Sequence, residues 1–159
     1  MISKSICNND KLCNQVSILL LEFLHYNKRK VVDDKNDDFS TESGIENDEV
    51  FHQIFANLCT TFDLEESTII YVLILIDKFI QKSKTCLNSK NIILITITAI
   101  SLSLKINQDV VISGNDFAEC CGLEKGQLSL MEGLFLKTIN YKVVVESKFF
   151  NDFKEMISK

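Results

Sequence analysis

Proline is absent from the chain, which has 159 residues, and arginine occurs only once, at Arg29. Proline breaks helices because it lacks a backbone N–H and clashes with the preceding turn, so its absence favours long helices. The net charge is -5. A protein that binds nucleic acid normally carries a basic patch that neutralises phosphates. The composition therefore favours helices and argues against a nucleic-acid partner.

Motifs of catalysis and of metal binding are also missing. The chain contains no glycine-rich phosphate loop, GxSxG elbow or HExxH motif. It has six cysteines but no CxxC pair, so the ligand spacing of a zinc site is absent. We interpret the two histidines, His25 and His52, as packing or surface residues. Two pairs of aspartates between residues 33 and 38 lie in a polar stretch, where solvation is their expected role. We therefore expect no metal, no cofactor and no small-molecule substrate.

No secretory signal with a basic start, an apolar core and a small-residue cleavage site is visible. The longest uncharged run, residues 92–104, would rise about 20 Å as a helix, whereas the hydrocarbon core of a bilayer is about 30 Å thick. We therefore expect an intracellular protein, cytoplasmic or nuclear, with reduced cysteines and no membrane contact. A chain of this length is expected to form one domain without disulfide or metal support.

The same uncharged run is predicted to be the centre of the fold. Four of its large apolar residues follow the spacing of one helix face: Ile93, Ile97, Ile100 and Leu104. The opposite side is small or weakly polar, and a helix without charge on any side is buried. We predict a buried central helix over residues 91–105. A strand over residues 92–99 is the alternative, because these residues are β-branched and partly alternate, but length and helical neighbours favour the helix.

Helical spacing of apolar residues recurs along the rest of the chain. The ranges that show it are 8–26, 49–61, 65–82, 115–121, 124–141 and 146–159. Asp63 is predicted to cap the helix over 65–82, because an acidic residue follows three positions later. Residues 31–48 are acidic and polar with few large apolar side chains, which is typical of a linker or mobile loop. The prediction is an all-α fold with seven helices, in which residues 1–30 form an N-terminal helix that precedes the linker.

Two of the apolar helices end in short motifs. Residues 67–83 read STIIYVLILIDKFIQKS and contain an Ile-Asp-Lys-Phe core at 76–79. Residues 92–109 read IILITITAISLSLKINQD, in which a run of small residues ends at Lys105.

A third motif follows at residues 128–145, which read LSLMEGLFLKTINYKVVV. Met131-Glu132 opens a leucine-rich helix there, and the helix finishes in an apolar-aromatic step at Tyr141. In this order and at this spacing, the three segments resemble the cyclin box. The similarity extends over about residues 48–153. Within the cyclins, the chain is most similar to the short, single-box phosphate-regulation and P/U-type cyclins, which also carry a helix and a polar linker before the box.

The resemblance implies a cyclin-box bundle of five helices around the buried central helix, with additional N- and C-terminal helices. Residues 49–159 would form this single box together with the C-terminal helix. The implied function is that of a non-catalytic regulatory subunit that binds a cyclin-dependent protein kinase and activates it by docking on its αC helix.

The resemblance also implies a set of kinase-binding residues. In the family, the lysine that ends the central helix and the glutamate that opens the fifth helix bind main-chain groups beside αC, and these correspond to Lys105 and Glu132. An ammonium offers three donors to carbonyl groups, and a carboxylate accepts from N–H groups. Apolar family contacts correspond to Ile106, Leu136 and Tyr141. The alternative roles of Lys105 and Glu132 are a charge at a helix C-terminus and a solvated carboxylate.

The chain departs from the family pattern at a structural aspartate. Many cyclins pair the residue equivalent to Asp77 with an arginine on the first box helix, but residues 49–61 contain no arginine or lysine. We expect that Asp77 needs another partner, and Lys78 and His52 are the candidates.

Other departures concern the choice of partner. Asn107 and Gln108 stand where acidic residues usually follow the central lysine, and no second box and no MRAIL-like docking segment are evident. A cyclin-fold module that binds a non-kinase partner, as transcription factors of this fold do, is therefore the alternative function. A small helical enzyme is the weakest hypothesis.

Overall fold

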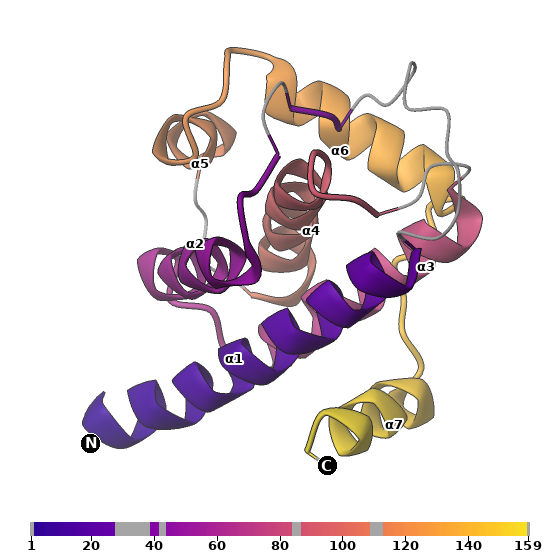
Figure 1. The fold of residues 1–159 in the computed structure, drawn as a ribbon. Coiled ribbons are helices and arrows are strands. Elements are labelled where there is room, and N and C mark those ends of the chain that lie inside the picture. Colours follow the sequence, from indigo (N-terminus) through magenta and orange to yellow (C-terminus); the bar gives the residue numbers. More distant parts are fainter. Residues whose placement is uncertain (1, 28–38, 42–43, 84–86, 109–112, 159) are drawn as a thin grey trace.

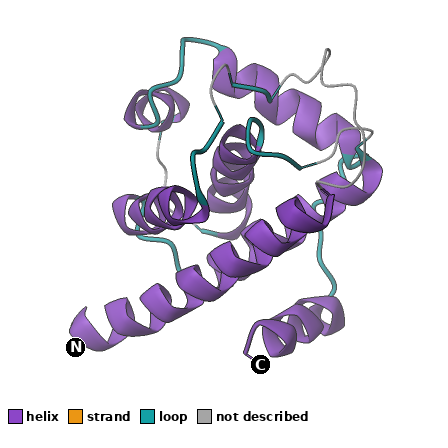
Figure 2. Cartoon of the chain, in the orientation of Figure 1, coloured by secondary structure: helices purple, strands orange, loops and turns teal. Residues whose placement is uncertain are grey.

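The computed structural model describes residues 2–27, 39–41, 44–83, 87–108 and 113–158. These residues form helices and no strand, which confirms the all-α prediction (Figures 1 and 2). The helices are α1 (Ile2–Asn27), α2 (Asp48–Thr61), α3 (Glu66–Lys82), α4 (Ile92–Asn107), α5 (Gly114–Cys120), α6 (Gln127–Thr138) and α7 (Ser147–Ser158). None of the helices described is long and apolar enough to cross a membrane.

Helix α4 lies in the middle of the bundle, as the sequence predicts, and the strand alternative is wrong (Figure 1). From residue 92 to residue 104, every side chain except that of Ile93 is buried. Helix α3 packs directly on α4, and its residues 68–76 are all buried. A helix buried on all sides needs neighbours on all sides: α4 also packs on α6, and α3 also packs on α1, α6 and α7.

Helix α1 packs on α2 and α3, and polar contacts join α1 to α2 at two levels. Near the middle of α1, Ser17 forms a hydrogen bond with His52 Nδ1. At the end of α1, His25 Nε2 lies 3.0 Å from the carboxylate of Asp48. The two histidines thus lie in packing and surface positions, as predicted. Asn47 caps α2, because its Oδ1 accepts a hydrogen bond from Val50 N at 3.0 Å.

The predicted cap of α3 is wrong. Asp63 has a left-handed backbone (φ 48°) and terminates α2 rather than starting α3. The N–H of Leu64 donates to the Cys59 carbonyl at 3.0 Å, so the chain closes α2 before it turns. The N-cap position of α3 is Glu65, whose backbone N–H donates to Gln108 Oε1 at 3.0 Å. A side chain from the distant end of α4 therefore satisfies a donor at the start of α3.

Left-handed residues also set the ends of α5 and α6. Gly122 follows α5 with φ 70°, as the sequence predicts. Gly126, with φ 83°, delays the start of α6, and Asn140 and Tyr141, with φ 57° and 58°, follow its end. Helix α6 is therefore shorter than the range 124–141 that apolar spacing predicts.

The described end of the predicted linker packs against the helical body. Phe39 is buried, and its ring meets that of Phe79 edge to face, with 5.2 Å between the centroids. Thr41 donates from both its backbone N–H and its hydroxyl to the Lys90 carbonyl, at 2.8 Å each. Residues 31–38 of the predicted linker lie outside the described residues.

Candidate functional site

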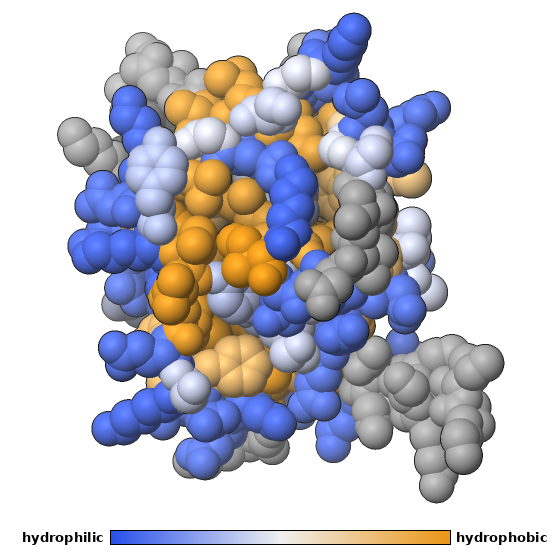
Figure 3. All heavy atoms as spheres, turned by 180° about the vertical axis from the view of Figure 1, so that it is seen from behind, coloured by the Kyte–Doolittle hydropathy of each residue, from blue (hydrophilic) through white to orange (hydrophobic). Residues whose placement is uncertain are grey.

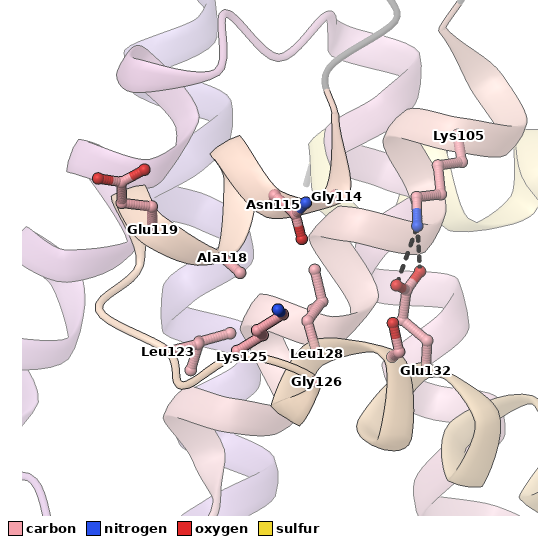
Figure 4. Close-up of a pocket in the computed structure, with 11 residues that line it drawn as sticks. Lys105, Gly114, Asn115, Ala118, Glu119, Leu123, Lys125, Gly126, Leu128 and Glu132 are labelled. Carbon is pink, nitrogen blue, oxygen red and sulfur yellow. Dashed lines mark hydrogen bonds and ion pairs between the residues drawn. The ribbon is translucent and has the colours of Figure 1, made fainter.

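Lys105 and Glu132, which are 27 residues apart in sequence, meet in an ion pair. Lys105 Nζ donates to both carboxylate oxygens of Glu132, at 2.9 and 2.8 Å (Figure 4). Lys105 lies in the last turn of α4, and Glu132 lies within α6. The lysine side chain is 50% exposed and that of the glutamate only 12%. The pair therefore has one solvated and one nearly buried member.

The burial of Glu132 follows from its place on α6. The buried residues of this helix are Leu128, Met131, Glu132 and Phe135, which share the face that packs on α4. A carboxylate on such a face loses hydration and needs a compensating charge. Lys105 supplies that charge from the end of the neighbouring helix.

A cavity of about 340 Å³ opens beside the ion pair, between α5 and the start of α6. Glu119 of α5 lies on the opposite side of this cavity from Lys105 and Glu132, and Lys125 lines it from the loop between the two helices (Figure 4). Two positive and two negative side chains thus surround a space with an apolar floor, which includes Leu128. Such a surface fits the polar main chain of a partner protein better than it fits a strongly charged ligand.

Two of the three predicted apolar contacts lie on the helices that carry the ion pair, and the third, Tyr141, follows the end of α6. Ile106 directly follows Lys105 and is 44% exposed. Leu136 lies one turn after Glu132 on α6 and is partly buried against the core. Tyr141 is 65% exposed and left-handed, and its N–H donates to the Leu136 carbonyl at 2.8 Å. This hydrogen bond ends α6 and fixes the backbone of Tyr141 beside it.

Neither candidate partner of Asp77 binds it, so that prediction is wrong. Gln81, one turn later on α3, donates to Asp77 Oδ2 at 2.9 Å. Lys78 Nζ instead donates to the carbonyl groups of Lys142 and Val144, at 3.0 and 3.5 Å. His52 faces Ser17. Partial burial raises the pKa of Asp77, and the hydrogen bond from Gln81 opposes that shift.

Among the described residues, no group of three histidine, cysteine or acidic side chains could hold a metal ion. The four cysteines whose side chains are described are free thiols: Cys13, Cys59, Cys120 and Cys121. Burial and the neighbouring Cys120 raise the pKa of Cys121 to about 11, so this thiol stays protonated at neutral pH.

Residues 18–144, well over half of the chain, match the family described as cyclin, N-terminal domain. The chain belongs to the cyclin family. Cyclins are generally regulatory proteins without catalytic activity that bind protein partners, typically kinases. The match includes α2 to α6 and the ion pair, and it ends before α7. A search of curated proteins finds no match.

Some features of the site could not be identified from the sequence. The resemblance pointed to Lys105 and Glu132 but not to their mutual ion pair, because the crossing of α4 and α6 brings them together. Glu119 of α5 and the loop residue Lys125 belong to no motif in the sequence. The sequence indicates Lys78 only as a candidate partner of the adjacent Asp77, whereas its ammonium donates to carbonyl groups 64 and 66 residues away.

Proposed function

We propose that this cyclin is the regulatory subunit of a cyclin-dependent protein kinase, which it binds and activates by docking on the αC helix. The contact surface consists of Lys105, Glu132, Ile106, Leu136 and Tyr141. The observation that carries the proposal is the ion pair between Lys105 and Glu132 at the edge of an open cavity, with exposed apolar side chains beside it.

The chemistry of the pair suits recognition of a partner's main chain. An ammonium has three hydrogens, and Glu132 engages two of them, so Lys105 keeps a donor for a carbonyl group. The carboxylate retains lone pairs that can accept from backbone N–H groups. Because each residue holds the other in place, little side-chain entropy remains to be lost on binding.

Docking in this position would activate the kinase by holding αC inward. The αC glutamate then pairs with the β3 lysine of the kinase, and this arrangement aligns the phosphates of ATP. The cyclin itself touches no reacting atom in this mechanism. The subgroup that we propose is the single-box phosphate-regulation and P/U-type cyclins, because one cyclin domain is matched and α1 precedes the box helices α2 to α6.

Affinity capture from a lysate of the protein's own cells tests the proposal. The wild-type chain is compared with the double variant Lys105→Ala/Glu132→Ala and with the control Glu49→Ala/Lys82→Ala, which removes one exposed residue of each charge from α2 and α3. We expect wild type and control to retain a cyclin-dependent kinase and the double variant to lose it.

Two other outcomes would change the conclusion. A kinase retained equally by all three chains would keep the function and refute the site. If no kinase is retained by any chain, the kinase-regulator proposal fails, and a cyclin-fold module for a non-kinase partner replaces it.

A further inference from the structure

The chain leaves α6 through two residues in a strained conformation. Asn140 and Tyr141 have φ 57° and 58°, in the left-handed region that asparagine tolerates and that bulky side chains rarely adopt. Such strain persists only where the surrounding structure holds it, and it is concentrated at binding sites. Because Tyr141 is 65% exposed, its ring gains little from burial that could offset the strain.

Backbone hydrogen bonds hold Tyr141 from the side of α6. Its N–H donates to the Leu136 carbonyl at 2.8 Å, and the N–H of Lys142 donates to the Ile139 carbonyl at 3.2 Å. The Tyr141 carbonyl accepts from the N–H of Val143 at 3.0 Å. These bonds attach Tyr141 to the end of its own helix, and none of them reaches another helix.

Lys78 of α3 supplies an attachment to another helix. Its Nζ donates to the carbonyl groups of Lys142 and Val144, at 3.0 and 3.5 Å, and in the described part of the chain it forms no ion pair. Burial lowers the pKa of Lys78, and the positive charge of Lys142 lowers it further. An ammonium with reduced hydration forms strong hydrogen bonds to carbonyl groups. Lys78 therefore fixes the backbone one and three residues after Tyr141.

Apolar side chains of the same segment are divided between the core and the surface. Val143 and Val145 are partly buried and pack against the core, whereas Val144 is 84% exposed. Hydrophobic side chains also gather in a band on the rear face of the molecule, with polar side chains around them (Figure 3). The segment is thus held at two valines and two carbonyl groups, while the side chains of Tyr141 and Val144 remain exposed.

We propose that Lys78 is a positioning residue for the kinase contact surface: it holds the segment after Tyr141, so that the tyrosine ring has one arrangement before the kinase binds. The inference rests on the proposed function, because Tyr141 belongs to the contact surface proposed above. A side chain that is ordered in the free protein loses less entropy when it binds. Lys78 therefore strengthens the complex without touching the kinase.

Removal of the ammonium group tests this inference. Lys78→Met keeps an unbranched apolar side chain but has no hydrogen-bond donor. The matched control is Lys82→Met, which removes the same charge from an exposed position one turn later on α3. The probe is the cyclin-dependent kinase that the wild-type chain retains from its own cell lysate, purified and titrated with each full-length chain. We expect Lys78→Met to weaken binding about 3- to 10-fold, the effect of ordering about one side chain on binding, and Lys82→Met to bind like wild type.

A double-mutant cycle shows whether Lys78 acts through Tyr141. Tyr141→Asn removes the ring and introduces a residue that tolerates the left-handed backbone. If Lys78 acts through the ring, adding Lys78→Met to Tyr141→Asn should weaken binding no further, whereas Lys78→Arg, which keeps donors for both carbonyl groups, should bind like wild type. Two effects that multiply would show that Lys78 acts independently of Tyr141 and would overturn the inference. Wild-type affinity in the Lys78→Met chain would overturn it as well.

Hydrogen exchange of the free chain gives a measurement that does not depend on the kinase. In Lys78→Met, the N–H groups of Lys142 and Val143 should exchange faster because their segment has lost its attachment to α3, whereas those of α4 should exchange as in wild type. Unchanged exchange at these two groups, or faster exchange across the entire chain, would contradict a positioning role. If Lys78→Met fails to fold, Lys142→Gly decides instead, because it loosens the backbone beside Tyr141 and should weaken binding. Wild-type affinity in that variant would reject the inference.

The Lys105→Ala/Glu132→Ala chain, run in parallel, distinguishes the two proposals. Loss of binding in this chain but not in Lys78→Met keeps the kinase function and rejects the positioning role of Lys78. If no kinase binds the wild-type chain, the proposed function fails, and the inference that rests on it falls as well.

Discussion

Glu132 is the residue whose environment most needs an explanation, because its carboxylate lies on the buried face of α6 with only 12% of the side chain exposed. Its attraction to Lys105 offsets the lost hydration, but the lysine is half exposed, so solvent screens the pair. We therefore expect the ion pair to contribute only about 1 kcal/mol to folding. Because the ion pair contributes so little to folding, both charged groups are suited to binding a partner protein.

A charge swap distinguishes an internal ion pair from a binding surface. Either single change, Lys105→Glu or Glu132→Lys, places two like charges together and should lower the free energy of unfolding. The double swap restores the attraction and should recover most of that loss in urea unfolding. It should not recover kinase binding, because donor and acceptor positions are exchanged. Binding restored by the swap would show that only the internal pair matters.

Asp77 should give the chain a specific pH dependence. Burial raises the folded-state pKa of Asp77 above its ordinary value of 3.8, so the unfolded chain ionises first as the pH rises. The carboxyl group therefore reduces stability above its folded-state pKa, and this penalty disappears as the pH falls below about 4. Asp77→Asn, which can still accept from Gln81, should be more stable than wild type at pH 7. Urea unfolding at pH 7 and pH 3.5 measures this, and a difference that grows towards low pH would contradict it.

At the scale of the helices, α4 combines complete burial with several hydroxyl groups. Thr98 Oγ1 donates to the Leu94 carbonyl at 2.7 Å, whereas Thr96 Oγ1 and Ser103 Oγ have no partner among the described residues. An unpaired buried hydroxyl costs about 1 to 3 kcal/mol. The central helix therefore carries two buried hydroxyl groups that stabilise the described part of the fold through no hydrogen bond.

Two valine substitutions on α4 test this difference. Thr96→Val replaces an unpaired hydroxyl with a methyl group and should raise the free energy of unfolding by about 1 kcal/mol. Thr98→Val removes a formed hydrogen bond and should be the less stable of the two variants. Chemical denaturation of both proteins measures the difference. The reverse order would show that Thr96 has a partner in solution.

Phe39 joins the segment before α2 to the helical body. Its side chain is 4% exposed and contacts Phe79, which itself stacks on Phe135. Phe39→Ala should lower the free energy of unfolding by about 3 kcal/mol, as expected for loss of a buried aromatic ring. Ser40→Ala, at an exposed neighbouring position, should change it by only a few tenths. An equal, small effect of both changes would contradict the packing of this segment.

At the scale of the whole molecule, the sequence predicts the helices well and their junctions poorly. Burial of α4 follows from an uncharged run with helical spacing, because such a pattern has few other solutions. The predicted N-cap at Asp63 is wrong. Acidic residues between two helices give the same sequence pattern whether Asp63 ends the first helix or starts the second. The burial of Phe39 could not be predicted, because this residue lies in a polar stretch and a single aromatic residue produces no periodicity.

The candidate site shows a similar division. Family motifs point to Lys105 and Glu132 individually, but their contact depends on how α4 crosses α6, which no local pattern encodes. The predicted partners of Asp77 are wrong because both were sought among basic residues. The actual donor, Gln81, is neutral and lies one turn away on the same helix. The packing of α7 against α3 is a long-range contact that could not be read from either helix alone.

Kinase activation is the central claim, and one assay tests it most directly. The cyclin-dependent kinase that the wild-type chain retains is purified, and its phosphorylation of a peptide substrate is measured with increasing amounts of added chain. The account predicts that wild type raises the rate to a plateau and that Lys105→Ala/Glu132→Ala, at the same concentrations, does not. A rate that is unchanged by the wild-type chain, or raised equally by both chains, would contradict it.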